Sequence, residues 1–151
     1  MVFETNIEEK WLDVKQYASK RCDMVAFNVL YECNEYFVFM KEYQDSMILG
    51  EDLDKEYASG QSIFFRYTEK MKSFMEEKSF DSFYNDFIED PSFYIAGKEV
   101  VWTITHENYI FLADDLPDFE YFRAKGFLLE IEQQRDIPPK VSFWKQLKKL
   151  F

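Results

Sequence analysis

Residues 100–113, VVWTITHENYIFLA, contain the clearest fold signal in the chain. Two runs rich in β-branched and aromatic residues flank the polar segment His106-Glu107-Asn108, which is typical of two strands joined by a tight turn. The sequence therefore predicts an antiparallel hairpin with strands over 100–105 and 109–113. A further strand is predicted just upstream, over 93–95.

Two helices are predicted before this hairpin. Over 59–76, which begins at Ser59-Gly60, the apolar residues fall on one helical face: Ile63, Phe64, Tyr67, Met71, Phe74 and Met75. Over 79–90, Ser79 is a candidate N-cap and Pro91 ends the element. Its inward residues are Phe80, Phe83, Tyr84, Phe87 and Ile88.

The first 43 residues predict a helix followed by a hairpin. Apolar residues spaced by three and four indicate a helix over 6–20. The runs MVAFNVLYE (24–32) and YFVFMKEY (36–43) predict two strands that separate at Cys33-Asn34-Glu35. A helical stripe also fits this region, so a helix stays open as the alternative; its members are Val25, Val29, Cys33, Phe37 and Met40.

The order of these elements predicts an α+β fold, with an antiparallel sheet packed against about three helices. We expect a polar loop over 50–58, a short helical or irregular piece over 116–125, and a strand over 127–132. Residues 1–139 form the predicted domain. Residues 140–151 contain four lysines and no acid, and their spacing predicts a basic amphipathic helix that either docks on the body or binds a partner.

Composition and charge limit the function classes. The chain has 151 residues, 47% hydrophobic and 20% aromatic, so it can form a core despite a net charge of -11. That charge argues against direct binding of nucleic acid, and no apolar run is long enough for a membrane span. Two cysteines spaced by eleven match no zinc pattern. With no secretory leader apparent, they indicate free thiols in a cytoplasmic protein.

No catalytic motif is present, and no cofactor or metal is expected. The only histidine, His106, lies in the predicted turn, where a solvated side chain is the ordinary outcome. A competing hypothesis is a metal-dependent hydrolase whose carboxylates meet in space. Its candidate ligands are Asp114, Asp115 and Asp118, or Glu130 and Glu132.

A partner-binding surface is the leading hypothesis, because carboxylates alternate with aromatic rings after the hairpin. Aromatic anchors inside a charged rim are typical of protein interfaces. The candidate residues are Asp114, Asp115, Asp118, Phe119, Glu120 and Tyr121, together with Glu51, Asp52 and Asp54 in the 50–58 loop. The expected partner is a basic protein, and the expected state is a monomer or a small homo-oligomer.

In size, acidity, aromatic content and order of elements, the chain resembles the small acidic immunity proteins that bacteria pair with toxins. EEKWLDV (8–14) and WTITHENYIFLADDL (102–116) are the most suggestive stretches. The resemblance implies a cytoplasmic, non-enzymatic inhibitor that covers the active site of a toxin, with a basic nuclease as the leading target. A phage inhibitor of a host nuclease has the same electrostatic character. An adaptor domain that makes its contact through residues 140–151 is the third hypothesis.

Overall fold

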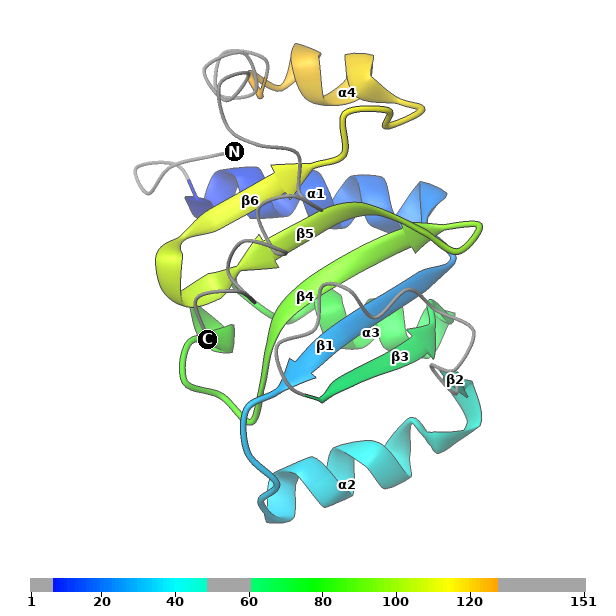
Figure 1. The fold of residues 1–151 in the computed structure, drawn as a ribbon, viewed down its shortest axis with the longest axis vertical. Helices are drawn as coiled ribbons and strands as arrows, with labels where there is room; N and C mark the ends of the chain where they lie inside the picture. Colours follow the sequence, from blue (N-terminus) through cyan, green and yellow to red (C-terminus); the bar gives the residue numbers. More distant parts are fainter. Residues whose placement is uncertain (1–6, 49–60, 128–151) are drawn as a thin grey trace, which may run out of the picture.

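A six-stranded antiparallel sheet organises the computed structural model, which describes residues 7–48 and 61–127 (Figure 1). The helices are α1 (Ile7–Arg21), α2 (Asn34–Glu42), α3 (Glu69–Glu76) and α4 (Phe119–Ala124). The strands are β1 (Met24–Val29), β2 (Met47–Ile48), β3 (Ser62–Arg66), β4 (Ile88–Ile95), β5 (Lys98–Ile104) and β6 (Tyr109–Leu112). Short 3-10 turns form at η2 (Gln44–Ser46), η4 (Asp81–Phe83) and η5 (Thr105–Glu107). The predicted α+β class is confirmed.

The first strand of the chain lies in the middle of the sheet, whose order is β2-β3-β1-β4-β5-β6. Within β1, Val25 pairs with Phe65 of β3 and with Phe93 of β4. Residues 24–27 are buried, as expected for a strand with neighbours on both sides and apolar contacts on both faces. The β5–β6 pair is the predicted hairpin, with Val101 opposite Leu112 and Ile104 opposite Tyr109.

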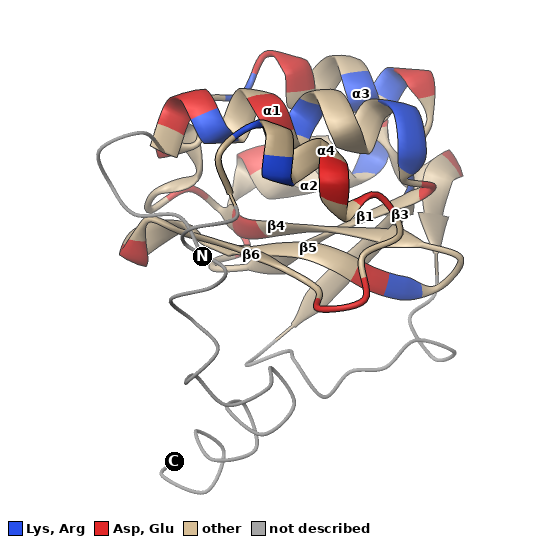
Figure 2. Cartoon of the chain, turned by 90° about the horizontal axis from the view of Figure 1, so that it is seen from above, with Lys and Arg blue, Asp and Glu red and all other residues tan. Residues whose placement is uncertain are grey.

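The helices lie on one side of the sheet, as Figure 2 shows with the sheet nearly edge-on. Trp11 of α1 is fully buried there, with its ring 5.7 Å from Phe80, 6.0 Å from Phe83 and 6.0 Å from Phe93. Its indole N–H donates to the carbonyl of Lys78 at 2.9 Å. Aromatic pairs in these tilted and edge-on arrangements dominate the core.

The predicted hairpin over 24–43 is half wrong. Its first run forms β1, but residues 34–42 form helix α2. The buried residues of α2 are Tyr36 and Phe39, with Met40 and Tyr43 packed beside them, which is a helical spacing. The alternative helical stripe also fails, because Phe37 points to solvent with 57% of its surface exposed.

The two helices predicted over 59–90 are largely wrong. Residues 62–66 form strand β3, in which Ile63 and Phe65 face the helix-covered core and Phe64 belongs to a cluster on the opposite face. Among the described residues of the first predicted helix, 61–76, only 69–76 is α-helical, and it is capped by the Thr68 hydroxyl, which accepts from Met71 N at 3.2 Å. Residues 81–83 form a single 3-10 turn, and β4 starts at Ile88. Pro91 therefore lies inside a strand rather than at the end of a helix.

Other predictions are confirmed or fall outside the described residues. The helix over 6–20 matches α1, and the piece over 116–125 contains α4, which ends before Gly126 at a φ of +88°. The 50–58 loop, all but the first residue of the 127–132 strand, and the 140–151 helix lie outside the described residues. None of the helices within 7–48 and 61–127 combines the length and apolarity needed to cross a bilayer.

Candidate functional site

The predicted partner site at 114–121 occupies the connection from β6 to α4, and much of its charge is paired. Asp115 forms an ion pair with Lys98, and Glu120 lies 3.4 Å from the Arg123 guanidinium. Both pairs are solvent-exposed and contribute little to stability. Asp114 is exposed and has no ion pair within the described part of the chain.

The Asp118 side chain makes contacts within the protein. Its Oδ2 accepts hydrogen bonds from the Tyr17 hydroxyl at 3.0 Å and from Arg21 Nε at 2.7 Å. Burial raises the pKa of Tyr17, and so does its hydrogen bond to Asp118. The hydrogen bond between Arg21 and Asp118 raises the pKa of Arg21. Asp118 thereby joins the start of α4 to α1.

The rings of this segment are also engaged within the protein. Tyr121 is half-buried, its hydroxyl donates to the carbonyl of Asp13 at 3.1 Å, and its ring lies 5.5 Å from Tyr17. Phe119 is half-buried. The structure keeps these residues in one segment, but it uses the Tyr121 side chain to attach α4 to α1. Glu51, Asp52 and Asp54 lie outside the described residues.

Most of the large exposed apolar side chains of the described residues lie in a different part of the chain, around helix α2. Seven large hydrophobic residues are exposed in the described part of the chain, and five of them lie in the β1–α2 connection, near the start of α2, or, for Tyr84, in the segment that contacts this connection. We call these five the apolar patch: Leu30 (44% exposed), Tyr31 (47%), Phe37 (57%), Val38 (69%) and Tyr84 (55%). The Tyr31 hydroxyl donates to the carbonyl of Asn85 at 2.9 Å, which holds Tyr84 beside the β1–α2 connection.

A shallow groove of about 440 Å³, wide open to solvent, lies along α2 and shares Val38 with this patch. Its lining residues are Asn34, Glu35, Val38, Phe39, Glu42 and Tyr43. Glu35 and Glu42 are seven residues apart, so they stand two helical turns, or about 10 Å, from each other with Val38 between them. An apolar surface with carboxylates at both ends fits a partner segment that carries basic and apolar side chains.

The local charge favours such a partner. Residues 30–48 contain four acids, Glu32, Glu35, Glu42 and Asp45, and one base, Lys41. A hydrogen bond from the Cys33 side chain, together with a backbone hydrogen bond, lowers the pKa of Glu35 and keeps it ionised. Glu42 is paired with Lys70 at 2.7 Å, in an exposed ion pair that a competing cation can replace.

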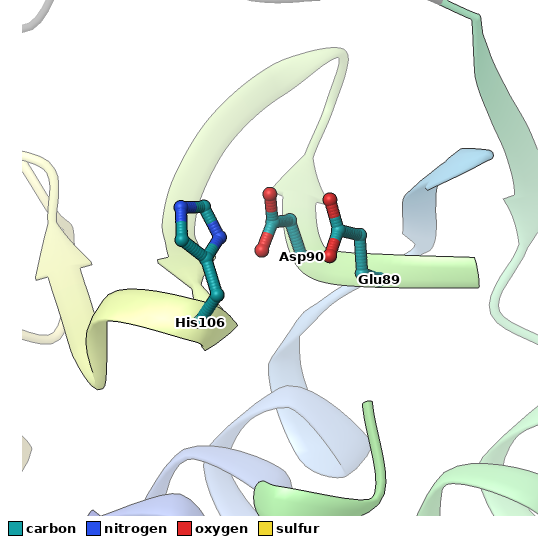
Figure 3. Close-up of side chains that lie close together, drawn as sticks. All are labelled: Glu89, Asp90 and His106. Atoms are coloured by element: carbon teal, nitrogen blue, oxygen red, sulfur yellow. The ribbon is translucent and has the colours of Figure 1, made fainter. Parts of the chain in front are cut away.

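Glu89, Asp90 and His106 form the one group of potential metal ligands detected among the described residues (Figure 3). One oxygen of each carboxylate and one imidazole nitrogen all lie within 4.8 Å of one another. Glu89 and Asp90 come from the start of β4, and His106 comes from η5. Partial burial, together with the neighbouring charge of Asp90, raises the pKa of Glu89.

Comparison of the chain with protein-family models, with curated proteins and with solved structures gave no match. Any statement about what this chain binds therefore depends on its own residues.

Sequence reasoning missed both of these features. Phe37 and Val38 were assigned to a strand that pairs in a sheet, and Tyr84 to the buried face of a helix, so neither segment was expected at the surface. Glu89 and Asp90 fell within that same predicted helix over 79–90, which was not expected to meet the hairpin turn. The sequence did carry a signal for the turn itself, because asparagine is one of the residue types enriched in the left-handed conformation. Asn108 takes that conformation, with φ at 58°.

Proposed function

We propose that this protein is a non-enzymatic inhibitor that binds a basic protein partner through the apolar patch and the acidic groove of α2. A bacterial toxin, with a nuclease as the class that the charge fits best, is the target we propose. The observation that carries the proposal is the set of five exposed apolar residues on and next to a helix whose groove has carboxylates at both ends.

Physical arguments support this reading. Large exposed apolar groups are costly in water, and a cluster of them typically indicates a binding surface. Aromatic residues such as Phe37, Tyr31 and Tyr84 give the strongest anchors when a partner covers them. The surrounding acids steer a basic partner and disfavour an acidic one, and a net charge of -11 adds long-range attraction.

The test is affinity capture from the source cells with three forms of the tagged protein, followed by binding measurements on the captured partner. The wild type is compared with the double variant Phe37→Ser, Val38→Ser. The control is Leu12→Ser, because Leu12 is exposed to a similar degree as Phe37, 54% against 57%, but lies on α1. The double variant should weaken binding of the purified partner at least about tenfold.

The expected result has three parts. A basic protein is retained by the wild type and by Leu12→Ser, is lost from the double variant, and binds more weakly as salt increases. Once purified, that protein loses its own activity when one equivalent of inhibitor is added. Equal capture by all three forms, or a captured protein that keeps full activity in the complex, would contradict the proposal.

A further inference from the structure

The three side chains of Figure 3 are brought together by strand pairing and by an irregularity in β4. Ala26 pairs with Ser92, but Asn28 pairs with Glu89, so β4 contains one extra residue at this point. Asp90 has a φ of 51°, in the left-handed region. Successive side chains of a regular strand point to opposite faces, whereas a bulge changes their direction. Here it lets the Glu89 and Asp90 carboxylates approach the same imidazole.

The neighbouring strand holds His106 opposite these carboxylates. The Thr103 hydroxyl donates to the carbonyl of Pro91 at 2.8 Å, which fixes the end of β5 against the bulge. Two residues further on, Thr105 donates its backbone N–H (2.7 Å) and its hydroxyl (2.8 Å) to Asp90 Oδ1. His106 is the next residue, so its position follows from the same contacts.

These hydrogen bonds also orient the Asp90 carboxylate. Asn28 Nδ2 donates to Asp90 Oδ2 at 3.3 Å, and Asn28 Oδ1 accepts from the Ser62 hydroxyl at 3.0 Å. Metal ligands in proteins are held by outer hydrogen bonds of this kind, which set their direction and increase their affinity. The carboxylate keeps lone pairs available, since Oδ2 accepts only this one hydrogen bond among the described residues.

The charge at this place is uncompensated by any described lysine or arginine, since neither Glu89 nor Asp90 has an ion pair within 7–48 and 61–127. A third carboxylate lies close by, because Glu107 Oε1 is 3.6 Å from His106 Nε2. Ionised carboxylates at short range repel each other, and a divalent cation between them removes that repulsion. The imidazole supplies a nitrogen ligand, which selects zinc-like transition metals over calcium and magnesium.

We propose that Glu89, Asp90 and His106 bind one divalent transition-metal ion, with Zn²⁺ as the best-fitting ion. The site joins the irregular start of β4 to the β5–β6 turn. It shares no residue with the apolar patch and does not depend on the proposed inhibitor function.

The chain provides a clean probe, because His106 is its only histidine. The full chain is prepared without a histidine tag and treated with a chelator. Proton NMR then follows the imidazole signals of His106 during addition of Zn²⁺, and calorimetry measures the affinity and stoichiometry. We expect the His106 signals to move and to saturate at one equivalent. Binding at a cysteine alone would leave these signals in place, and that result would overturn the proposal.

Two variants and one control test the ligands. Glu89→Gln and His106→Gln should each weaken Zn²⁺ binding at least about tenfold, since each removes one ligand. Asp114→Asn is the control, because it removes an equal charge from an exposed position outside the cluster. Circular dichroism establishes that each variant is folded. A Glu89→Gln variant that binds Zn²⁺ as tightly as Asp114→Asn would overturn the proposal, as would His106 signals that do not move at millimolar Zn²⁺.

Discussion

The same substitution at two positions of α2 should have very different effects on stability. Phe39 is 6% exposed, and its ring lies within 6.0 Å of five aromatic rings, those of Phe27, Tyr43, Phe65, Phe74 and Phe87. Replacing a buried phenylalanine by alanine costs about 3–5 kcal/mol in lost burial and cavity formation. Against a total stability of about 5–15 kcal/mol, Phe39→Ala leaves a marginal protein.

Phe37 lies two residues earlier and is 57% exposed, with a ring contact to Tyr36 at 5.2 Å. Little apolar surface is lost on truncation there, and alanine has a higher helix propensity than phenylalanine by about 0.5 kcal/mol. We therefore expect Phe37→Ala to change the free energy of unfolding by less than about 0.5 kcal/mol. The difference between the two variants should be about 3 kcal/mol or more.

Urea denaturation followed by circular dichroism measures both free energies, with equal slopes indicating that the unfolded states are comparable. If Phe37→Ala costs more than about 2 kcal/mol, the ring is packed against the protein, and the apolar patch loses one of its five members. If Phe39→Ala costs less than about 1 kcal/mol, α2 is not docked on the sheet as described. The first result would remove the support for the proposed function, and the second would contradict the fold.

Two further predictions concern stability. The Glu8 carboxylate accepts hydrogen bonds from the backbone N–H groups of Phe80 and Asp81 at 3.1 and 2.8 Å, whereas Glu9 shares with Glu8 only its place in the first turn of α1. Glu8→Ala should therefore lower the free energy of unfolding by about 2 kcal/mol more than Glu9→Ala, as measured by urea denaturation. Equal losses would show that these hydrogen bonds do not contribute to stability. Burial raises the pKa of Cys22 to about 12. The folded protein therefore keeps a thiol proton that the unfolded chain releases above about pH 9. The free energy of unfolding should then fall as pH rises toward 12, by up to about 1.4 kcal/mol per pH unit. Cys22→Ala should flatten that decline, which denaturation curves between pH 8 and 11 would detect, and the slope that remains belongs to buried tyrosines such as Tyr67, whose pKa burial also raises.

Local patterns predicted the elements whose pairing partners are close in the sequence. The β5–β6 hairpin and α1 each carry their own periodicity, so the helix predicted over 6–20 and the strands predicted over 100–105 and 109–113 match α1, β5 and β6 to within one or two residues at their ends. For residues 62–66, a helical stripe and a buried strand fit the same short apolar run. Pairing with β1, more than thirty residues earlier, decides for the strand, and no local window contains that information.

The candidate sites show the same limit. Acidity and aromatic content were readable from composition, but which rings are exposed depends on packing. Tyr121 was a candidate anchor and is attached to α1, whereas Phe37 was assigned to a strand and lies in the apolar patch. The approach of His106 to Glu89 needs an extra residue in β4 and a left-handed Asp90, which sequence periodicity does not reveal.

The central position of β1 has a consequence for biosynthesis. Met24 pairs with Tyr94, so the strand leaves the ribosome 70 residues before its second neighbour. At ordinary translation rates of about 5–20 residues per second, MVAFNV spends about 4–14 s without that neighbour. An apolar β-prone segment waiting in this way is open to association with other chains. We therefore expect overexpressed protein to partition into inclusion bodies more at high temperature and fast synthesis, and slow expression in the cold to increase the correctly folded yield.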